Sequence, residues 1–321
     1  MSLKAEISSE IWGLSWVLYA VASAFTFINS ILLSFLEGCN LVSKIQSLRF
    51  KIGIVTSLVM LLGLAVGLKL YALSISASVG AIVGAFFIIK NFKNTIRQLW
   101  KISQNATYDW WPEFSSLIWR YAISWGSGFF VFQLFTPLTF YFYGAVPAGK
   151  IGISIAMWTA GFNIAISWIT AVTPKLNMLI SEKKWNQLDK LFNDSLAKSV
   201  GTMILGGLGF FLVEYFIGAK FNFFARILAS KGMAILFISW LLQVIVNAMS
   251  IYLRSHKREP LVLVSFFNAV IVLCGTAFCG MFLESEYIFF GFLTGTIFQC
   301  ITTFKIFQNY RWQHANYNGV K

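Results

Sequence analysis

The side chains that could carry out catalysis in this chain are few and scattered. The two histidines are His256, inside the basic segment RSHKREP at 254–260, and His314 near the end. A general base needs a nucleophile or an acid within hydrogen-bond reach, and no spacing in the sequence supplies such a pair. The four cysteines lie in or beside apolar runs without the spacing of metal ligands. We therefore predict a protein that is not an enzyme and that holds no metal and no cofactor.

Polar side chains inside apolar runs are more informative, because burying them in lipid is costly and they tend to face the interior of a helix bundle. Two are acidic, Glu37 and Glu214. The neutral ones are Asn29, Gln133, Asn163, Gln243, Asn247, Asn268 and Gln299. Each is either a hydrogen-bond partner between helices or a group that touches a ligand.

Cations near the ends of the apolar runs form a third group. Glu113 precedes Arg120 by two helical turns, so the two side chains share a face. One interpretation is a structural ion pair, and the other is that the planar guanidinium of Arg120 binds a phosphate group. Arg254, Lys257 and Arg258 form a second cluster, which either binds a similar anion or only marks the cytoplasmic side.

The composition defines the elements that must position these residues. Hydrophobic residues make up 58% of the 321 and charged residues 12%, with a mean hydropathy of +0.72. The apolar residues come in runs of about 20, which suit membrane-spanning helices rather than the short alternating strands of a β-barrel. The net charge of +13 lies in short connectors and not on one extended face, so we expect no nucleic acid partner. The sequence predicts an all-α integral membrane protein surrounded by membrane lipids.

We predict about nine transmembrane helices. Their approximate bounds are 12–36, 51–68, 70–90, 117–142, 151–173, 198–217, 232–252, 261–283 and 285–305. Most of the 25 Lys and Arg residues fall on one side, and cytoplasmic loops are enriched in these residues. The C-terminus is therefore expected in the cytoplasm and the N-terminus outside.

The fourth predicted span, 117–142, is interrupted by polar residues and by a proline. Gln133, Thr136 and Pro137 would gain nothing from facing lipid, and Pro137 removes a backbone hydrogen bond. We expect this span to face other helices or a wet cavity, and Pro137 to introduce a bend that acts as a hinge.

Two connectors, 91–103 and 182–196, carry apolar residues at helical spacing. We interpret them as helices that lie in the headgroup layer, and the alternative is that they pack on the protein's own cytoplasmic end.

Three glycine pairs have the G-x-x-x-G spacing that lets two helices approach closely. They are Gly63–Gly67, Gly80–Gly84 and Gly291–Gly295.

Four stretches, 35–39, 112–125, 132–137 and 252–260, resemble the polysaccharide or O-antigen flippases, and they follow the same order along the chain. The resemblance implies two six-helix lobes around a central cavity. It also implies the transfer of undecaprenyl-diphosphate-linked oligosaccharide from the inner to the outer leaflet of the bacterial inner membrane by alternating access. Polysaccharide polymerase and chain-length machinery are the implied protein partners.

The resemblance also implies a domain organisation. By this resemblance the chain would lack the first three helices of the family, so that 1–100 would be a partial N-terminal lobe, 101–116 a linker between lobes, and 117–321 a complete C-terminal lobe. Arg120 would contact the diphosphate, with Gln133, Glu37, Arg254 and Lys257 as further substrate-binding candidates. The alternatives are a MATE-like small-molecule antiporter, a membrane-embedded glycosyltransferase or polymerase, and an inactive truncated remnant.

Overall fold

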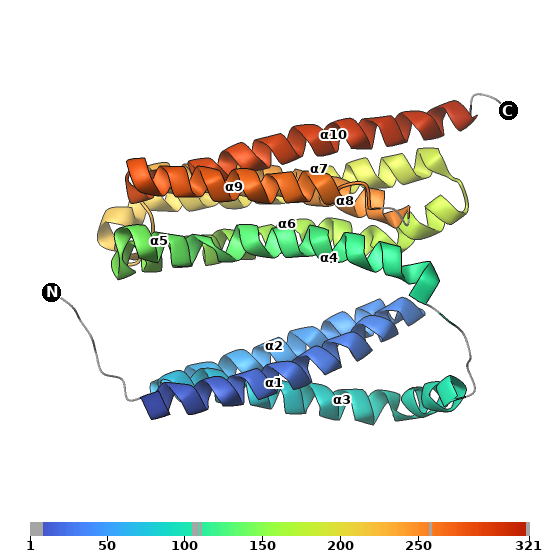
Figure 1. The fold of residues 1–321 in the computed structure, drawn as a ribbon, viewed down its shortest axis with the longest axis horizontal. Helices are drawn as coiled ribbons and strands as arrows, with labels where there is room; N and C mark the ends of the chain where they lie inside the picture. The colour runs from blue at the N-terminus through green and yellow to red at the C-terminus, as the bar shows by residue number, and fades with distance from the viewer. Residues whose placement is uncertain (1–8, 105–108, 110, 257–258, 319–321) are drawn as a thin grey trace. The chain divides into compact units, whose positions relative to one another are not determined.

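The computed structural model describes residues 9–104, 109, 111–256 and 259–318, and these residues form helices and short connections without a strand (Figure 1). Eight of the described helices are long and apolar enough to cross a membrane. The predicted all-α integral membrane protein is confirmed.

The chain divides into two compact units, Met1–Tyr108 and Asp109–Lys321. The first contains α1 (Ser9–Leu36), a π-helical turn (Glu37–Leu41), α2 (Val42–Ala65) and α3 (Leu70–Gln104). Helices α1 and α2 both pack against α3. A small buried core holds them together, made of Leu33, Leu36, Ile45, Leu48 and Ile88.

The second unit contains seven helices, two of which form one interrupted span. They are α4 (Trp111–Gln133), α5 (Phe135–Tyr143), α6 (Ala145–Ser181), α7 (Trp185–Ile217), α8 (Ser230–Ser255), α9 (Val262–Phe282) and α10 (Phe290–Asn318). Helix α8 packs against α6, α7 and α10, and α9 packs between α10 and α4. The ends of α6, α8 and α10 lie together with the starts of α4 and α7 (Figure 1), and we call this side the basic end because Lys183, Lys184 and Arg254 lie there.

The predicted span 117–142 is divided between α4 and α5, which are separated at Leu134. Pro137 has no N–H to offer the carbonyl of Gln133, and its ring clashes with that carbonyl in a regular helix. The helix restarts with a bond from the Leu138 N–H to the Leu134 carbonyl, 3.0 Å long. A hinge motion at Pro137 stays a prediction, to be tested by whether Pro137→Ala changes the accessibility of cysteines placed along 130–140.

The interpretation of 182–196 as a helix in the headgroup layer is wrong, whereas the position of 91–103 in that layer stays a prediction. Residues 91–103 belong to the continuous helix α3, and 185–196 are the first turns of α7. Leu188 and Phe192 are fully buried against the second unit itself, and Phe192 lies 4.9 Å from the ring of Tyr252 in α8. An amphipathic helix needs an apolar surface, and here the neighbouring helices provide it in place of the lipid.

An ion-pair cluster fixes the same part of α7 to α8 and α10. Asp189 accepts a hydrogen bond of 3.0 Å from the Tyr252 hydroxyl and forms an ion pair of 2.8 Å with Arg311. Three helices therefore meet at one carboxylate at the basic end.

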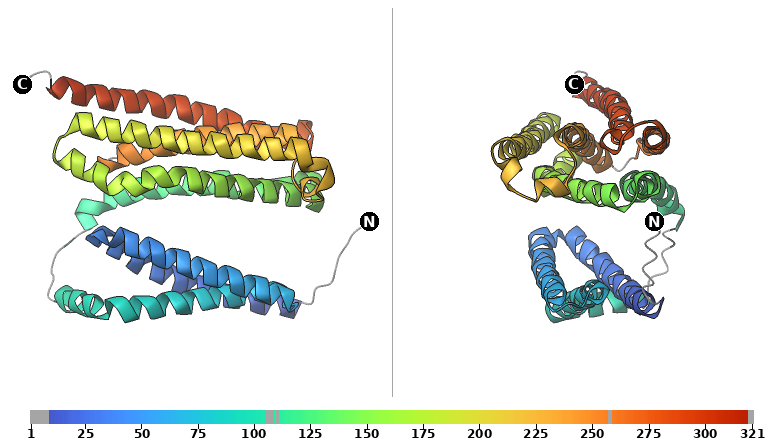
Figure 2. Two further views of the ribbon diagram at one scale, coloured as in Figure 1. Left: turned by 180° about the vertical axis from the view of Figure 1, so that it is seen from behind. Right: turned by 90° about the vertical axis from the view of Figure 1, so that its left-hand side faces the viewer.

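Two of the three predicted glycine pairs, Gly80–Gly84 and Gly291–Gly295, lie where helices touch. A Cβ atom on Gly291 would overlap with backbone atoms of Gly275 and Thr276, and one on Gly295 would overlap with Val272, so α9 and α10 are in backbone contact. The end-on view shows these two helices side by side (Figure 2). Gly67, by contrast, has φ +85° and serves the turn between α2 and α3.

We expect Gly291→Ala to destabilise the second unit by about 1–3 kcal/mol, because an added methyl group has no room between two backbones. The change should appear as a lower melting temperature of the purified chain in detergent. Gly209→Ala is the matched control, since Gly209 is a glycine of α7 with nothing within 4 Å of the new methyl group. The control should be neutral or slightly stabilising, as alanine favours a helix. Equal melting temperatures for the two variants would contradict the backbone contact.

Candidate binding cavity

The second unit has a partly open cavity of about 370 Å³ lined by residues of α4, α8, α9 and α10. This volume lies in the range of small-ligand sites, about 300–1,000 Å³. Its described lining residues are Ser124, Trp125, Gly128, Phe129, Val131, Phe132, Gln133, Gln243, Val246, Asn247, Ser250, Arg254, Ser265, Asn268 and Gln299.

Five side-chain amides line this space, and we call it the amide cavity. They are Gln133 of α4, Gln243 and Asn247 of α8, Asn268 of α9 and Gln299 of α10. The sequence marked seven such amides within apolar runs, and the fold gathers five of them at one place. Gln243 and Asn247 are four residues apart on α8, so both project from the same face.

The other two amides lie elsewhere. Asn29 donates a hydrogen bond of 2.8 Å to the carbonyl of Ala81 in the first unit, and Asn163 is exposed on α6. Asn29 thus joins two helices, whereas Asn163 provides a matched residue outside the cavity.

Most of the hydrogen-bonding capacity of the amide cavity is unused. Asn268 donates from Nδ2 to Oε1 of Gln299 over 3.1 Å, which fixes both side chains. In the described structure, the side chains of Gln133, Gln243 and Asn247 form no hydrogen bond to protein. Each carries two N–H donors and one carbonyl acceptor, so the cavity wall presents both kinds of group.

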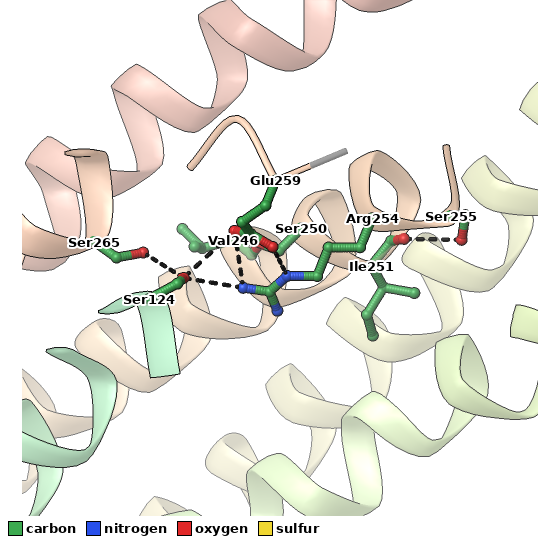
Figure 3. Close-up of polar contacts among 8 residues, drawn as sticks. All are labelled: Ser124, Val246, Ser250, Ile251, Arg254, Ser255, Glu259 and Ser265. Carbon is green, nitrogen blue, oxygen red and sulfur yellow. Dashed lines mark hydrogen bonds and ion pairs between the residues drawn. The ribbon is translucent and has the colours of Figure 1, made fainter. Parts of the chain in front are cut away.

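An ion pair between Arg254 and Glu259, drawn in Figure 3, lies at the basic end of the amide cavity. Arg254 Nε lies 2.6 Å from Oε2 of Glu259, and Arg254 Nη2 lies 3.2 Å from Oε1. The Glu259 side chain has no exposed surface, whereas 25% of the Arg254 side chain is exposed. The geometry is that of a bidentate pair, in which a buried carboxylate holds the guanidinium in one orientation.

Two serines extend this ion pair to neighbouring helices. Ser124 of α4 accepts a hydrogen bond of 3.2 Å from Arg254 Nη2, and its hydroxyl lies 3.1 Å from that of Ser265 in α9. The guanidinium carbon also lies 5.8 Å from the centre of the Tyr121 ring, a cation–π distance. Contacts from α4, α8 and α9 therefore hold the Arg254 side chain in place at the basic end of the amide cavity.

A larger cavity of about 700 Å³ adjoins the first at the basic end. Trp125 and Arg254 line both cavities, and the further lining residues are Thr173, Asn177, Ile180, Ser181, Ile251, Ser255 and His256. Arg254 therefore stands between a space open toward the basic end and the amide cavity behind it. Its Nη1 forms no hydrogen bond in the described structure.

Aromatic rings form the apolar part of the amide cavity. Trp125, Phe129 and Phe132 come from successive turns of α4. Phe132 is stacked on Trp240 with ring centres 5.2 Å apart, and it meets Phe292 edge-on at 5.8 Å. This ring is held rigidly by the core and offers an apolar surface to a ligand.

The candidate residues from the sequence divide into two groups. Gln133 and Arg254 meet at the amide cavity, whereas Arg120 is exposed on α4, one turn before Ser124, and does not line it. Glu37 belongs to the first unit, where it pairs with Arg49 at 3.2 Å and accepts a hydrogen bond from Gln46. Lys257 and the side chain of Glu113 lie outside the described residues, so the proposed Glu113–Arg120 pair stays a prediction.

Sequence reasoning missed Glu259, which positions Arg254. A signal was available, because Glu259 is the one acid in the basic segment 254–260 and it precedes Pro260. Ser124 and Ser265 carried no signal of their own. They are separated from Arg254 and from each other by long stretches of chain, and only the helix packing brings them together.

No known protein family, curated protein or solved structure matches this chain. The functional argument therefore depends on the chemistry of the amide cavity and its ion pair.

Proposed function

We propose that this multi-pass membrane protein is a flippase that moves an undecaprenyl-diphosphate-linked oligosaccharide from the inner to the outer leaflet of the bacterial inner membrane. The observation that carries the proposal is a polar, amide-lined cavity with an oriented arginine at its entrance, formed between helices of the second unit. Amide and hydroxyl groups suit sugar hydroxyls, an arginine suits a phosphate, and aromatic rings suit the apolar face of a sugar. Alternating access would expose the cavity to each side in turn.

The charge of the cavity favours this substrate over an organic cation. A site for a cation needs an available carboxylate, and the described lining offers none. The nearby carboxylate of Glu259 is occupied on both oxygens by Arg254. A MATE-like antiporter for cationic drugs is therefore the less favoured reading of the same cavity.

The distribution of cations predicts how the protein is oriented in the membrane. Cations gather there, so this end would face the cytoplasm together with the C-terminus. The lipid diphosphate would meet Arg254 from the larger cavity, while the sugar would enter the amide cavity behind it. The translocated product would then be available to polysaccharide polymerase and chain-length machinery.

The experiment that tests the proposal compares two asparagine variants in a strain whose surface polysaccharide depends on this chain. Asn247→Leu removes an amide from the cavity, and Asn163→Leu removes an exposed one from α6. We expect Asn247→Leu to reduce export by about 2- to 12-fold, since one lost hydrogen bond is worth about 0.5–1.5 kcal/mol. Lipid-linked oligosaccharide should accumulate on the cytoplasmic side, and Asn163→Leu should export normally. Normal export by both variants at normal protein levels would refute the use of this cavity.

Arg120 remains a candidate for direct contact with the diphosphate, as an exposed cation one turn from Ser124. If it makes a charge-assisted bond, Arg120→Ala should lower export by about 10- to 100-fold, because such a bond is worth about 1.5–3 kcal/mol. Arg120→Lys should retain part of the activity, as it keeps the charge but not the planar fork. Normal export by both variants would remove Arg120 from the site.

A further inference from the structure

The amide cavity is electrically balanced, and this limits what part of a ligand fits in it. Among the described lining residues Arg254 is the one with an ionisable side chain, and its charge is compensated by Glu259 at 2.6 and 3.2 Å. Beyond this pair the polar groups of the described lining are amides, serine hydroxyls and the indole N–H of Trp125. No charged partner therefore awaits a ligand charge among the amides.

A sugar carboxylate or ammonium group placed beside Gln243 and Asn247 would lose part of its hydration shell without gaining a counter-ion from these amides. Burying an unpaired charge is far more costly than burying a hydroxyl that is hydrogen-bonded. The amides of Gln133, Gln243 and Asn247 each offer donors and an acceptor from two helices, α4 and α8. Sugar hydroxyls and acetamido groups are likewise both donors and acceptors, so they match this wall without any charge.

The apolar side of the cavity reinforces this match. The Phe132 ring is held in place by Trp240 and Phe292, with ring centres 5.2 and 5.8 Å away, so it keeps an apolar surface beside the amides. It does provide a flat surface for the C–H face of a sugar ring.

We infer that the amide cavity selects an uncharged sugar residue, bearing hydroxyl or acetamido groups, and discriminates against uronic acids and amino sugars. This inference rests on the proposed function, in which the ligand is a lipid-linked saccharide. Gln133, Gln243 and Asn247 are the specificity-determining residues.

The test measures binding of four synthetic short-chain polyprenyl-diphosphate sugars to the full chain in lipid nanodiscs. The sugars are glucose, N-acetylglucosamine, glucuronic acid and glucosamine, and the sugar-free polyprenyl diphosphate is the reference. We expect the two neutral sugars to bind at least about tenfold more tightly than the two charged ones. Equal affinity for all four sugars would overturn the inference and leave the proposed function intact. Binding of none of the five lipids would overturn the proposed function and the inference together.

A charge placed in the wall should reverse the preference in a defined direction. Asn247→Asp adds a carboxylate of nearly the same size, so glucosamine should gain about tenfold in affinity and glucuronic acid should lose affinity. Gln243→Glu, one turn away on the same face, is a second variant should the first fold poorly. Asn163→Asp is the matched control, because this exposed residue of α6 does not line the cavity. If neither cavity variant changed the relative affinities for the four sugars, the sugar would be selected elsewhere in the protein and the inference would be overturned.

Discussion

Replacing Glu259 by alanine is expected to lower the free energy of unfolding by about 3 kcal/mol, at the lower end of the range for breaking a buried ion pair. The Glu259 side chain has no exposed surface, and both its oxygens bind Arg254. Its removal leaves a guanidinium that is three-quarters buried without a counter-ion. It also deprives Ser124 of one hydrogen-bond partner, at 3.4 Å. The measurement is the thermal or denaturant unfolding of the purified chain in detergent.

The control for this prediction is Glu284→Ala. Glu284 is exposed in the connection between α9 and α10 and forms no ion pair in the described structure, so its loss should change stability by less than about 0.5 kcal/mol. Equal effects of the two substitutions would mean that the Arg254–Glu259 pair contributes little to the fold. Glu259→Gln should destabilise less than Glu259→Ala, since the amide keeps one acceptor, but it should still be clearly destabilising because the guanidinium loses its counter-ion.

The membrane-spanning helices could be predicted because length and hydropathy are local properties of the sequence. The interruption near Gln133 and Pro137 could be predicted for the same reason, as a missing N–H acts on the carbonyl four residues earlier. The exact break at Leu134 follows from the same rule. In each case the residues that decide the structure are close together in the chain.

The environment of the amphipathic segments could not be predicted in this way. The apolar positions of 185–196 fit a lipid surface and a helix bundle equally well, because both present an apolar surface. This segment packs in the bundle because the ring centre of Phe192 lies 4.9 Å from that of Tyr252 and 5.3 Å from that of Phe307. In addition, Asp189 forms an ion pair with Arg311. These partners come from α8 and α10, at sequence distances that no local pattern reveals.

The candidate site shows the same division. The sequence identified the in-span amides as costly and therefore informative, but it could not tell which of them share one space. Gln133 and Gln299 come from helices at opposite ends of the second unit's sequence, and they meet through the packing of α4, α9 and α10. In the sequence, Arg120 and Arg254 are both cations near the ends of predicted spans. The structure distinguishes them, because Arg254 is paired with the buried carboxylate of Glu259 whereas Arg120 is exposed.

The strongest separation of stability from function is expected from the double variant Arg254→Gln/Glu259→Gln. Removing both charges leaves no uncompensated ion, so the double variant should recover most of the stability that Arg254→Gln alone loses. Replacement of a buried ion pair by well-packed apolar residues is often neutral or stabilising, so the two charges are not in themselves required for folding. The recovery should be measured as the coupling term of a double-mutant cycle between the two positions.

Export should not recover with stability. The double variant lacks the guanidinium that would meet the lipid diphosphate at the entrance of the amide cavity, and a lost charge-assisted bond corresponds to about 10- to 100-fold. The control is Asp189→Asn/Arg311→Gln, which removes the ion pair of 2.8 Å that joins α7 to α10 outside the cavity. This control should export at close to the normal rate. A double Arg254 and Glu259 variant that folds and exports normally would show that the ion pair serves the fold alone, because the one oriented cation of the described cavity wall would then be dispensable.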